Sequence, residues 1–307
     1  MKIKIFALLT ALLLVFSVGC GKDDGVSGLG ATKSFTVKDT LETVENKTAK
    51  VVLLYGQSNA TGVASNEYLK QNDFEAFSVA SSGYDSVKIN FITENGGNSS
   101  GGKFVPCKLG QAANANYFGP EVGIADILSK TYANETVFII KYSWGGTVLD
   151  FQWLNGNYGK GELYEAANSF TVTSLEYLKK KGYKPIIEAV CWMQGESDSI
   201  SDDMANKYYK NTEKLVGYLK ADLKGYTDGD FKFIDAGIAE IDAWVKHDAV
   251  NTAKKNYAET HENCYYFSTA EMGLTTLNEP AGKPDIAHYD STSMLKLGRK
   301  FGEFIVG

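Results

Sequence analysis

Residues 51–62 read Val-Val-Leu-Leu-Tyr-Gly-Gln-Ser-Asn-Ala-Thr-Gly, and they give the strongest indication of the fold class. It opens with an uninterrupted apolar run, which predicts a strand buried on both faces, as in a parallel sheet covered by helices. The run stops at Gly56, and polar residues follow at once. In open α/β sheets such a turn places the next side chains at the carboxyl edge, where ligands bind. The stretch therefore predicts that Ser58 lies at the functional edge of an α/β domain.

Similar apolar runs recur along the chain, separated by helix-like stretches. Further strands are expected at 136–142, 185–192, 231–238 and 264–268. Helices are expected at 120–133, 164–181, 201–224, 245–260 and 291–305. Residues 82–118, rich in Gly, Asn and Ser, are interpreted as a long loop with room for one strand at 86–92. The alternation predicts a three-layer αβα sandwich of flavodoxin-like type, with a central, mainly parallel sheet of about five strands.

The first residues of the chain have the pattern of an export signal. Two lysines precede an apolar run from Ile5 to Val18, which is shorter than the ~20 residues of a membrane-spanning helix. The run ends in Ser-Val-Gly-Cys, so Cys20 resembles the lipid-modified cysteine of a bacterial lipobox. We expect a lipoprotein signal peptide at 1–20 and a flexible tether at 21–45, with membrane contact only through the lipid. The protein would then be exported and lipid-anchored at the bacterial cell surface, whereas an ordinary signal peptide with a chance cysteine would make it secreted.

The composition argues against several kinds of partner. A net charge of −6 and a pI near 5.3 leave no basic patch, so nucleic acid is not an expected partner. Beyond Cys20 the cysteines are Cys107, Cys191 and Cys264, and none has the CxxC spacing of a zinc site. We therefore expect no metal and no organic cofactor. The sequence leaves open the disulfide state of the three cysteines and the oligomeric state.

The chain contains the three residue types that serine-based acyl transfer requires. A serine hydroxyl attacks a carbonyl only when an imidazole takes its proton, and that imidazole needs a carboxylate to orient it. Asp285 stands three residues before His288, in the loop that precedes the last expected helix. The other histidines, His247 and His261, lie in polar stretches typical of the surface. We expect Ser58, His288 and Asp285 to form a triad; otherwise the serine would cap a helix and the Asp–His pair would be a local ion pair.

Acyl transfer also needs N–H donors for the oxyanion of the transition state. The backbone N–H of Ser58 is one candidate. Gly145 and Gly146 follow one expected strand, and glycines let the backbone approach a ligand closely, although they also serve plain turns. Gln194 follows another strand and could donate from its side-chain amide.

Five short motifs occur in one order along the chain. They are Gly-Gln-Ser-Asn at 56–59, Gly-Pro-Glu at 119–121, Trp-Gly-Gly at 144–146, Trp-Met-Gln-Gly-Glu-Ser-Asp at 192–198 and Asp-Ile-Ala-His-Tyr-Asp at 285–290. Together they resemble the acetylesterase branch of the SGNH hydrolase superfamily. That branch holds the acetylxylan esterases of carbohydrate esterase family 6 and the sialic-acid-specific acetylesterase-like domains. The similarity covers roughly residues 50–306, so we expect one SGNH-type esterase domain at 46–307.

The resemblance implies roles for individual residues. It implies that Ser58 is the nucleophile, His288 the base and Asp285 the carboxylate that orients the base. It also implies that a glycine of the 144–146 loop and Gln194 stabilise the oxyanion. The remaining residues with an expected role are Gly119 as an alternative oxyanion donor, and Gln57, Asn59, Trp144 and Glu196 as substrate contacts.

Ala60 departs from the family pattern, because relatives commonly carry methionine after Gly-Gln-Ser-Asn. The sequence therefore does not indicate which side chains line the substrate pocket, whereas the expected triad is unaffected.

The expected function is removal of O-acetyl groups from an acetylated polysaccharide or oligosaccharide through an acetyl-enzyme. A sialate O-acetylesterase, or another SGNH hydrolase acting on lipid or aryl esters, is the first alternative. A carbohydrate-binding lipoprotein without catalysis is the second, and a glycosidase that uses Glu196 with Asp198 is a third. The identity of the glycan depends on loops 62–118 and 147–163, and their sequence does not indicate which glycan binds.

Overall fold

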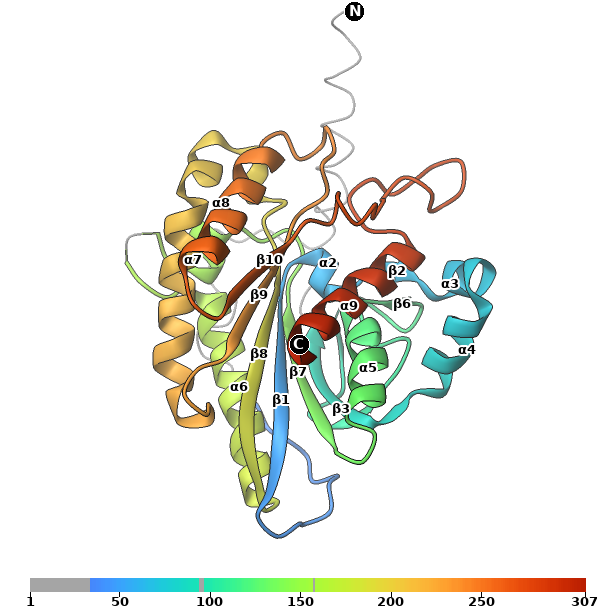
Figure 1. Cartoon of the computed structure of the whole chain (residues 1–307), viewed down its shortest axis with the longest axis vertical. Helices are drawn as coiled ribbons and strands as arrows, with labels where there is room; N and C mark the ends of the chain where they lie inside the picture. Colours follow the sequence, from blue (N-terminus) through green and yellow to red (C-terminus); the bar gives the residue numbers. More distant parts are fainter. Residues whose placement is uncertain (1–33, 94–96, 157) are drawn as a thin grey trace, which may run out of the picture.

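The computed structural model describes residues 34–93, 97–156 and 158–307 (Figure 1). The expected signal peptide at 1–20, including Cys20, lies outside these residues, and the expected tether is described only from residue 34. The described chain forms three layers, with helices on both faces of a central sheet. This confirms the αβα architecture.

Six parallel strands form the centre of the sheet. In spatial order they are β10 (Cys264–Phe267), β9 (Lys232–Ala236), β8 (Tyr183–Met193), β1 (Lys47–Gly56), β7 (Val137–Ser143) and β3 (Tyr84–Thr93). Two short strands, β4 (Asn98–Ser99) and β5 (Val105–Cys107), pair antiparallel with β3. The segments β2 (Ala64–Ser65) and β6 (Tyr117–Phe118) form a separate small sheet. All five expected strands are present, and the strand for which the long loop leaves room at 86–92 is the sixth parallel strand, β3.

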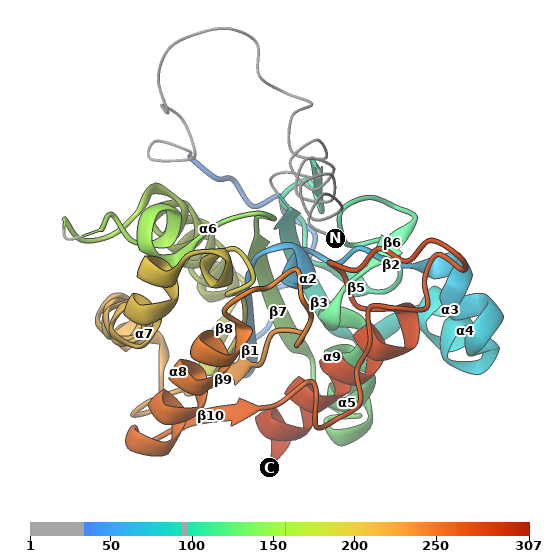
Figure 2. The same ribbon diagram turned by 90° about the horizontal axis from the view of Figure 1, so that it is seen from above.

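The helices cover the sheet in two groups. Helices α5 (Pro120–Thr131) and α9 (Ser291–Val306) lie on one face, and α6 (Glu162–Lys180), α7 (Asp202–Leu223) and α8 (His247–Thr260) lie on the other (Figure 2). Each agrees with its expected range to within two residues at either end. The shorter elements are α2 (Ser58–Thr61), α3 (Asn66–Asn72), α4 (Phe74–Ser82), the π-helical turn η1 (Leu149–Trp153) and the 3₁₀ turns η2 (Asp198–Ile200) and η3 (Lys224–Tyr226).

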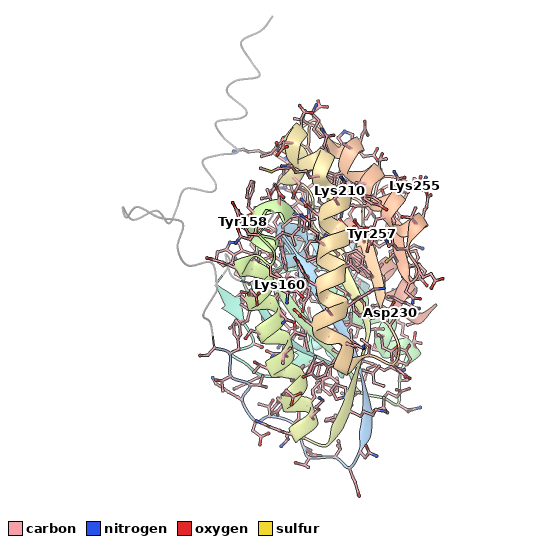
Figure 3. All side chains as sticks on the ribbon, turned by 90° about the vertical axis from the view of Figure 1, so that its left-hand side faces the viewer. Tyr158, Lys160, Lys210, Asp230, Lys255 and Tyr257 are labelled. Atoms are coloured by element: carbon pink, nitrogen blue, oxygen red, sulfur yellow. The ribbon has the colours of Figure 1, made fainter. Side chains whose placement is uncertain are left out.

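Two consecutive lysines of α8, Lys254 and Lys255, point to opposite sides of the layer formed by α6, α7 and α8. Figure 3 shows this layer from outside, where Lys210 and Lys255 belong to its exposed side. Lys254 points inward instead, is wholly buried, and pairs with the Asp235 carboxylate on β9. This buried pair ties α8 to the sheet immediately behind the loop that follows β8.

The order of the strands locates the functional edge. Strand β1 lies between β7 and β8, and its residues Val51–Tyr55 are buried. The chain leaves β1 towards β3 and leaves β8 towards β9, which are opposite directions along the sheet. Ligands bind in open α/β sheets where neighbouring strands diverge in this way, outside their carboxyl ends. Figure 2 looks onto that edge, with α2 near its middle.

Candidate active site

Three of the sequence motifs meet at the carboxyl edge of the sheet. In the parallel register, Gly56 of β1 lies opposite Ser143 of β7 and Met193 of β8. The segments that follow these residues begin with Gln57-Ser58, Trp144-Gly145 and Gln194-Gly195. The sheet therefore brings together three segments that lie far apart in the sequence, as expected from the apolar runs.

A sharp turn at Gly56 presents Ser58. Gly56 has φ +143°, and a Cβ at this position would lie 1.9 Å from the carbonyl oxygen of Met193, so only glycine fits. The turn is fixed by two backbone hydrogen bonds, from Gln57 N–H to Met193 O at 3.0 Å and from Trp144 N–H to Gly56 O at 3.1 Å. Ser58 begins α2 and is partly exposed, although the residues on either side of it are buried.

Asp285 and His288 form a pair within the loop between β10 and α9. The Asp285 Oδ2 atom lies 2.7 Å from His288 Nδ1, and the His288 N–H donates to the Asp285 carbonyl at 3.2 Å. Partial burial raises the pKa of Asp285, but the hydrogen bond and charge of His288 outweigh it, so the pKa lies below its usual value. A carboxylate on Nδ1 leaves Nε2 of the imidazole for a nucleophile, which is the arrangement that a general base needs.

Asn59 joins the histidine loop to the serine turn. Its side-chain Nδ2 donates to Ala287 O at 3.3 Å, and its Oδ1 accepts from Tyr289 N–H at 3.2 Å. These two residues flank His288, and Asn59 directly follows Ser58, so the three expected triad residues come to one place. The Ser58 hydroxyl and the His288 imidazole, both in the described chain, are not hydrogen-bonded to each other in this structure. Such contacts are often loose without substrate.

Glu196 lies beneath this junction. Its side chain is fully buried, and its Oε1 accepts from Asn59 Nδ2 at 2.7 Å. Burial raises the pKa of Glu196, against the opposing effects of the Asn59 hydrogen bond and the positive charges of Lys254 and His288. Asn59 and Glu196 are expected to contact substrate, but both are buried and hydrogen-bonded to each other where the Ser58 turn meets the His288 loop.

Gln57 is placed in the same way. Its side chain is buried, and its amide nitrogen donates to Thr147 O at 3.1 Å and to Glu196 Oε2 at 3.2 Å. It therefore supports the loop after β8 and does not face a substrate. Of the expected substrate contacts, only Trp144 is partly exposed beside the serine turn.

Gln194, expected to donate to the oxyanion, already has its donors in use. Its Nε2 donates to Thr147 O at 2.9 Å and to Asp198 Oδ2 at 2.6 Å, and its Oε1 accepts from the Tyr208 hydroxyl at 2.9 Å. The amide is wholly buried, so no N–H is left for an oxyanion. Burial raises the pKa of Asp198 to about 7, opposed by its hydrogen bonds from Gln194 and from the Leu149 N–H.

Gly119, the alternative oxyanion donor, is also engaged. Its N–H donates to Glu121 Oε1 at 2.8 Å, and Glu121 Oε2 lies 2.7 Å from the Nζ atom of Lys141. Both charged side chains are fully buried. The Gly-Pro-Glu motif therefore builds an ion pair under the site, and its partner Lys141 was missed by the sequence interpretation. The signal was one lysine inside the apolar run 136–142.

A comparison with family models gives the decisive match. The model described as SASA, carbohydrate esterase, sialic acid-specific acetylesterase, matches residues 48–306. The chain belongs to this family of carbohydrate esterases. It is therefore a hydrolase of the acetylesterase type, as the five motifs indicated.

Solved structures share the fold of this carbohydrate esterase. A protein from Arabidopsis thaliana has a TM-score of 0.60 and 18% identity, over 84% of this chain and 97% of its own. NanS has a TM-score of 0.61 and 16% identity, over 86% of this chain and 98% of its own. A search of curated proteins found no significant match.

Two of the expected oxyanion donors have a backbone N–H that no described residue accepts. The N–H of Ser58, in the first turn of α2, has no acceptor within the described residues, as is usual at a helix start. The N–H of Gly146 likewise has none in that part of the chain, and Gly146 is exposed with φ +71°. Gly145 is buried and already has an interaction partner.

In the described part of the esterase, no group of three or more His, Cys, Asp and Glu side chains could hold a metal ion. Cys107, Cys191 and Cys264 are free thiols in buried positions. No helix among these residues combines the length and the apolar character needed to cross a membrane.

Proposed function

We propose that this carbohydrate esterase removes O-acetyl groups with Ser58 as nucleophile, His288 as general base and Asp285 as the carboxylate that orients the base. The observation that carries the proposal is the Asp285–His288 pair, 2.7 Å apart, on a loop that Asn59 ties to the turn presenting Ser58. This arrangement supports the proposal, because the nucleophile, the base and its carboxylate would lie on neighbouring segments.

The reaction follows in two steps. Ser58 Oγ attacks the acetyl carbonyl while His288 Nε2 takes its proton, and Asp285 stabilises the imidazolium. The N–H groups of Ser58 and Gly146 donate to the oxyanion. Collapse of the tetrahedral intermediate breaks the ester bond, and His288 gives its proton to the departing sugar oxygen, which leaves as a hydroxyl. Water then attacks the acetyl-enzyme while His288 takes its proton. Collapse of the second intermediate releases acetate, and His288 returns the proton to Ser58 Oγ.

A neutral acetylated glycan of the xylan type suits this site best. The chain has a single arginine, Arg299, and its guanidinium is engaged with Asp126 at 2.7 Å between α9 and α5. Arginine is the preferred partner of a substrate carboxylate, so an anionic sugar would lack it here. The partly exposed ring of Trp144 offers an apolar surface for a sugar ring.

Sialic acid is the second candidate, because the matching family is described as sialic acid-specific. Its carboxylate would have to bind a lysine, and Lys283 lies exposed in the loop that carries Asp285 and His288.

We further propose that the protein is exported and lipid-anchored through Cys20, on the sequence of residues 1–20 alone. Cys20→Ala should abolish incorporation of labelled fatty acid and release the esterase from the membrane fraction. Membrane retention of that variant would contradict the anchor, and release of the wild type into the medium would indicate the secreted alternative.

Acetate release tests the chemistry. The purified protein without residues 1–20 should release acetate from acetylated xylan and from a simple acetyl ester, faster than from O-acetylated sialic acid. Ser58→Ala should abolish all three activities. Retained activity in that variant would overturn the mechanism, and preference for the sialic acid would overturn the neutral substrate. Activity on none of the esters would favour a binding protein.

A further inference from the structure

We propose that Asn59 is a positioning residue: it holds the His288 loop in register with Ser58, and without it the Asp285–His288 pair stays intact but misplaced. This inference rests on the proposed function, since it assumes that His288 serves Ser58. It gives Asn59 a role in the reaction rate, although the side chain is buried and has no free group for substrate.

The amide of Asn59 can take only one orientation. Its Nδ2 faces two acceptors, Glu196 Oε1 at 2.7 Å and Ala287 O at 3.3 Å, and its Oδ1 faces the Tyr289 N–H at 3.2 Å. Turning the amide over would set oxygen against a carboxylate and a carbonyl, and nitrogen against an N–H. The site thus requires one donor group and one acceptor on a side chain of this length.

The Asp285–His288 pair does not depend on Asn59. Asp285 holds the imidazole directly, and its Oδ1 also accepts from the Ala287 N–H at 3.2 Å. The ends of the loop are fixed separately, since Asp290 accepts from the Glu279 N–H at 3.0 Å and the Tyr289 hydroxyl donates to Thr269 at 2.8 Å. None of these bonds reaches the serine turn.

The side chain of Asn59 connects the loop that carries Asp285 and His288 to the serine turn. Among the described residues, every hydrogen bond between the segments 57–61 and 285–289 is made by the Asn59 side chain. Loss of this side chain should therefore let the catalytic pair shift as a unit relative to Ser58. A misplacement of about 1 Å can lower a rate about 100-fold.

The chain offers a matched control in Asn251 on α8. This buried asparagine clamps one residue of the loop between β9 and α8, accepting from Ile238 N–H at 2.9 Å and donating to Ile238 O at 3.1 Å. Asn59→Ala and Asn251→Ala thus remove the same kind of clamp, and both should destabilise the fold. Only the first should disturb the reaction.

The experiment compares both variants with wild type and Ser58→Ala on a simple acetyl ester. Asn59→Ala should lower kcat about 100-fold with KM changed less than about threefold, and labelling of Ser58 by a fluorophosphonate should slow in parallel. The strongly deshielded Nδ1 proton of His288 should persist in its NMR spectrum. Asn251→Ala should keep kcat within about twofold of wild type.

A reciprocal exchange tests the orientation. Asn59→Asp keeps the size of the side chain but sets a carboxylate against Glu196, so it should be slow. Adding Glu196→Gln places an amide donor opposite the new carboxylate at position 59, so the hydrogen bond between the two side chains forms in the reverse direction. The kcat should then recover in part. If Asn59→Ala fails to fold, the comparison of Asn59→Asp with the double variant tests the positioning role of Asn59.

Three results would overturn the inference. They are equal kcat values for Asn59→Ala and Asn251→Ala, loss of the deshielded His288 proton in Asn59→Ala, and no recovery in the exchange. Activity in Ser58→Ala would instead reject the proposed function itself, so the two failures can be told apart.

Discussion

The ammonium of Lys141, buried on β7, lies 2.7 Å from Glu121 Oε2 and also donates at 2.8 Å to the carbonyl of Thr61, the last residue of the helix that Ser58 begins. This pair holds α5 and α2 against the sheet below the active edge. Losing one partner of a buried ion pair costs about 3–5 kcal/mol, because the other charge stays buried alone.

We expect Lys141→Met to lower the free energy of unfolding by about 3–5 kcal/mol in urea titrations. Lys130 is the control, since its own side chain is 67% exposed and its buried partner Asp126 keeps a second ion pair with Arg299 at 2.7 Å. Lys130→Met should cost less than about 1 kcal/mol. Equal small losses in both variants would show that the buried pair contributes little.

Stability should also depend on pH through Asp198. Burial raises the pKa of Asp198 to about 7 in the folded protein, whereas it is about 3.9 in an unfolded chain. The folded state therefore binds this proton more tightly, and the free energy of unfolding should fall as pH rises from about 4 to about 7. Asp198→Asn removes the titrating group, so its stability should fall less over that range. The free energy of unfolding is measured by urea titration at each pH. An equal dependence on pH in wild type and Asp198→Asn would contradict this prediction.

The sequence predicted the layers and the edge well because both depend on local pattern. Apolar runs such as Val51–Tyr55 must be buried on both faces, and the residues after them must emerge at one edge in a parallel sheet. The pairing of Asp285 with His288 could be predicted because one loop holds both. Helices α3 and α4 were missed because they are short, although Ser65 and Asp73 cap them with their side chains.

The sequence could not show which polar residues at the edge face the substrate. Gln57, Asn59 and Glu196 follow buried strands just as Ser58 does, and their direction depends on partners far away in the sequence. Lys141 is a similar case, because nothing in an apolar run shows that its lysine has a buried carboxylate to meet. Such contacts belong to the tertiary structure and have no local pattern.

Two glycines should respond to alanine in opposite ways. Gly56 has φ +143° and no room for a Cβ next to Met193 O, so Gly56→Ala should leave little folded, active protein. Gly217 lies inside α7 with nothing within 4 Å of a new Cβ. Gly217→Ala should raise the free energy of unfolding by about 0.4–1 kcal/mol and leave activity unchanged. Normal yield and activity of Gly56→Ala would contradict the strict turn geometry.

Gln194 decides between a catalytic and a structural use of the Gln-Gly-Glu-Ser-Asp motif. Gln194→Ala leaves Tyr208, Thr147 and Asp198 with unmet hydrogen bonds, and each such buried group costs about 1–3 kcal/mol. Losing an oxyanion donor would instead lower kcat about 10²–10³-fold.

Because the donors of Gln194 are already in use, we expect its replacement to act on stability. Gln194→Ala should unfold at much lower urea than wild type, whereas the kcat of its folded fraction should fall less than about tenfold, since the backbone donors at Ser58 and Gly146 remain. The opposite result, a hundredfold loss of kcat with unchanged unfolding, would make Gln194 an oxyanion donor after all. It would require the amide to leave Asp198 when substrate binds.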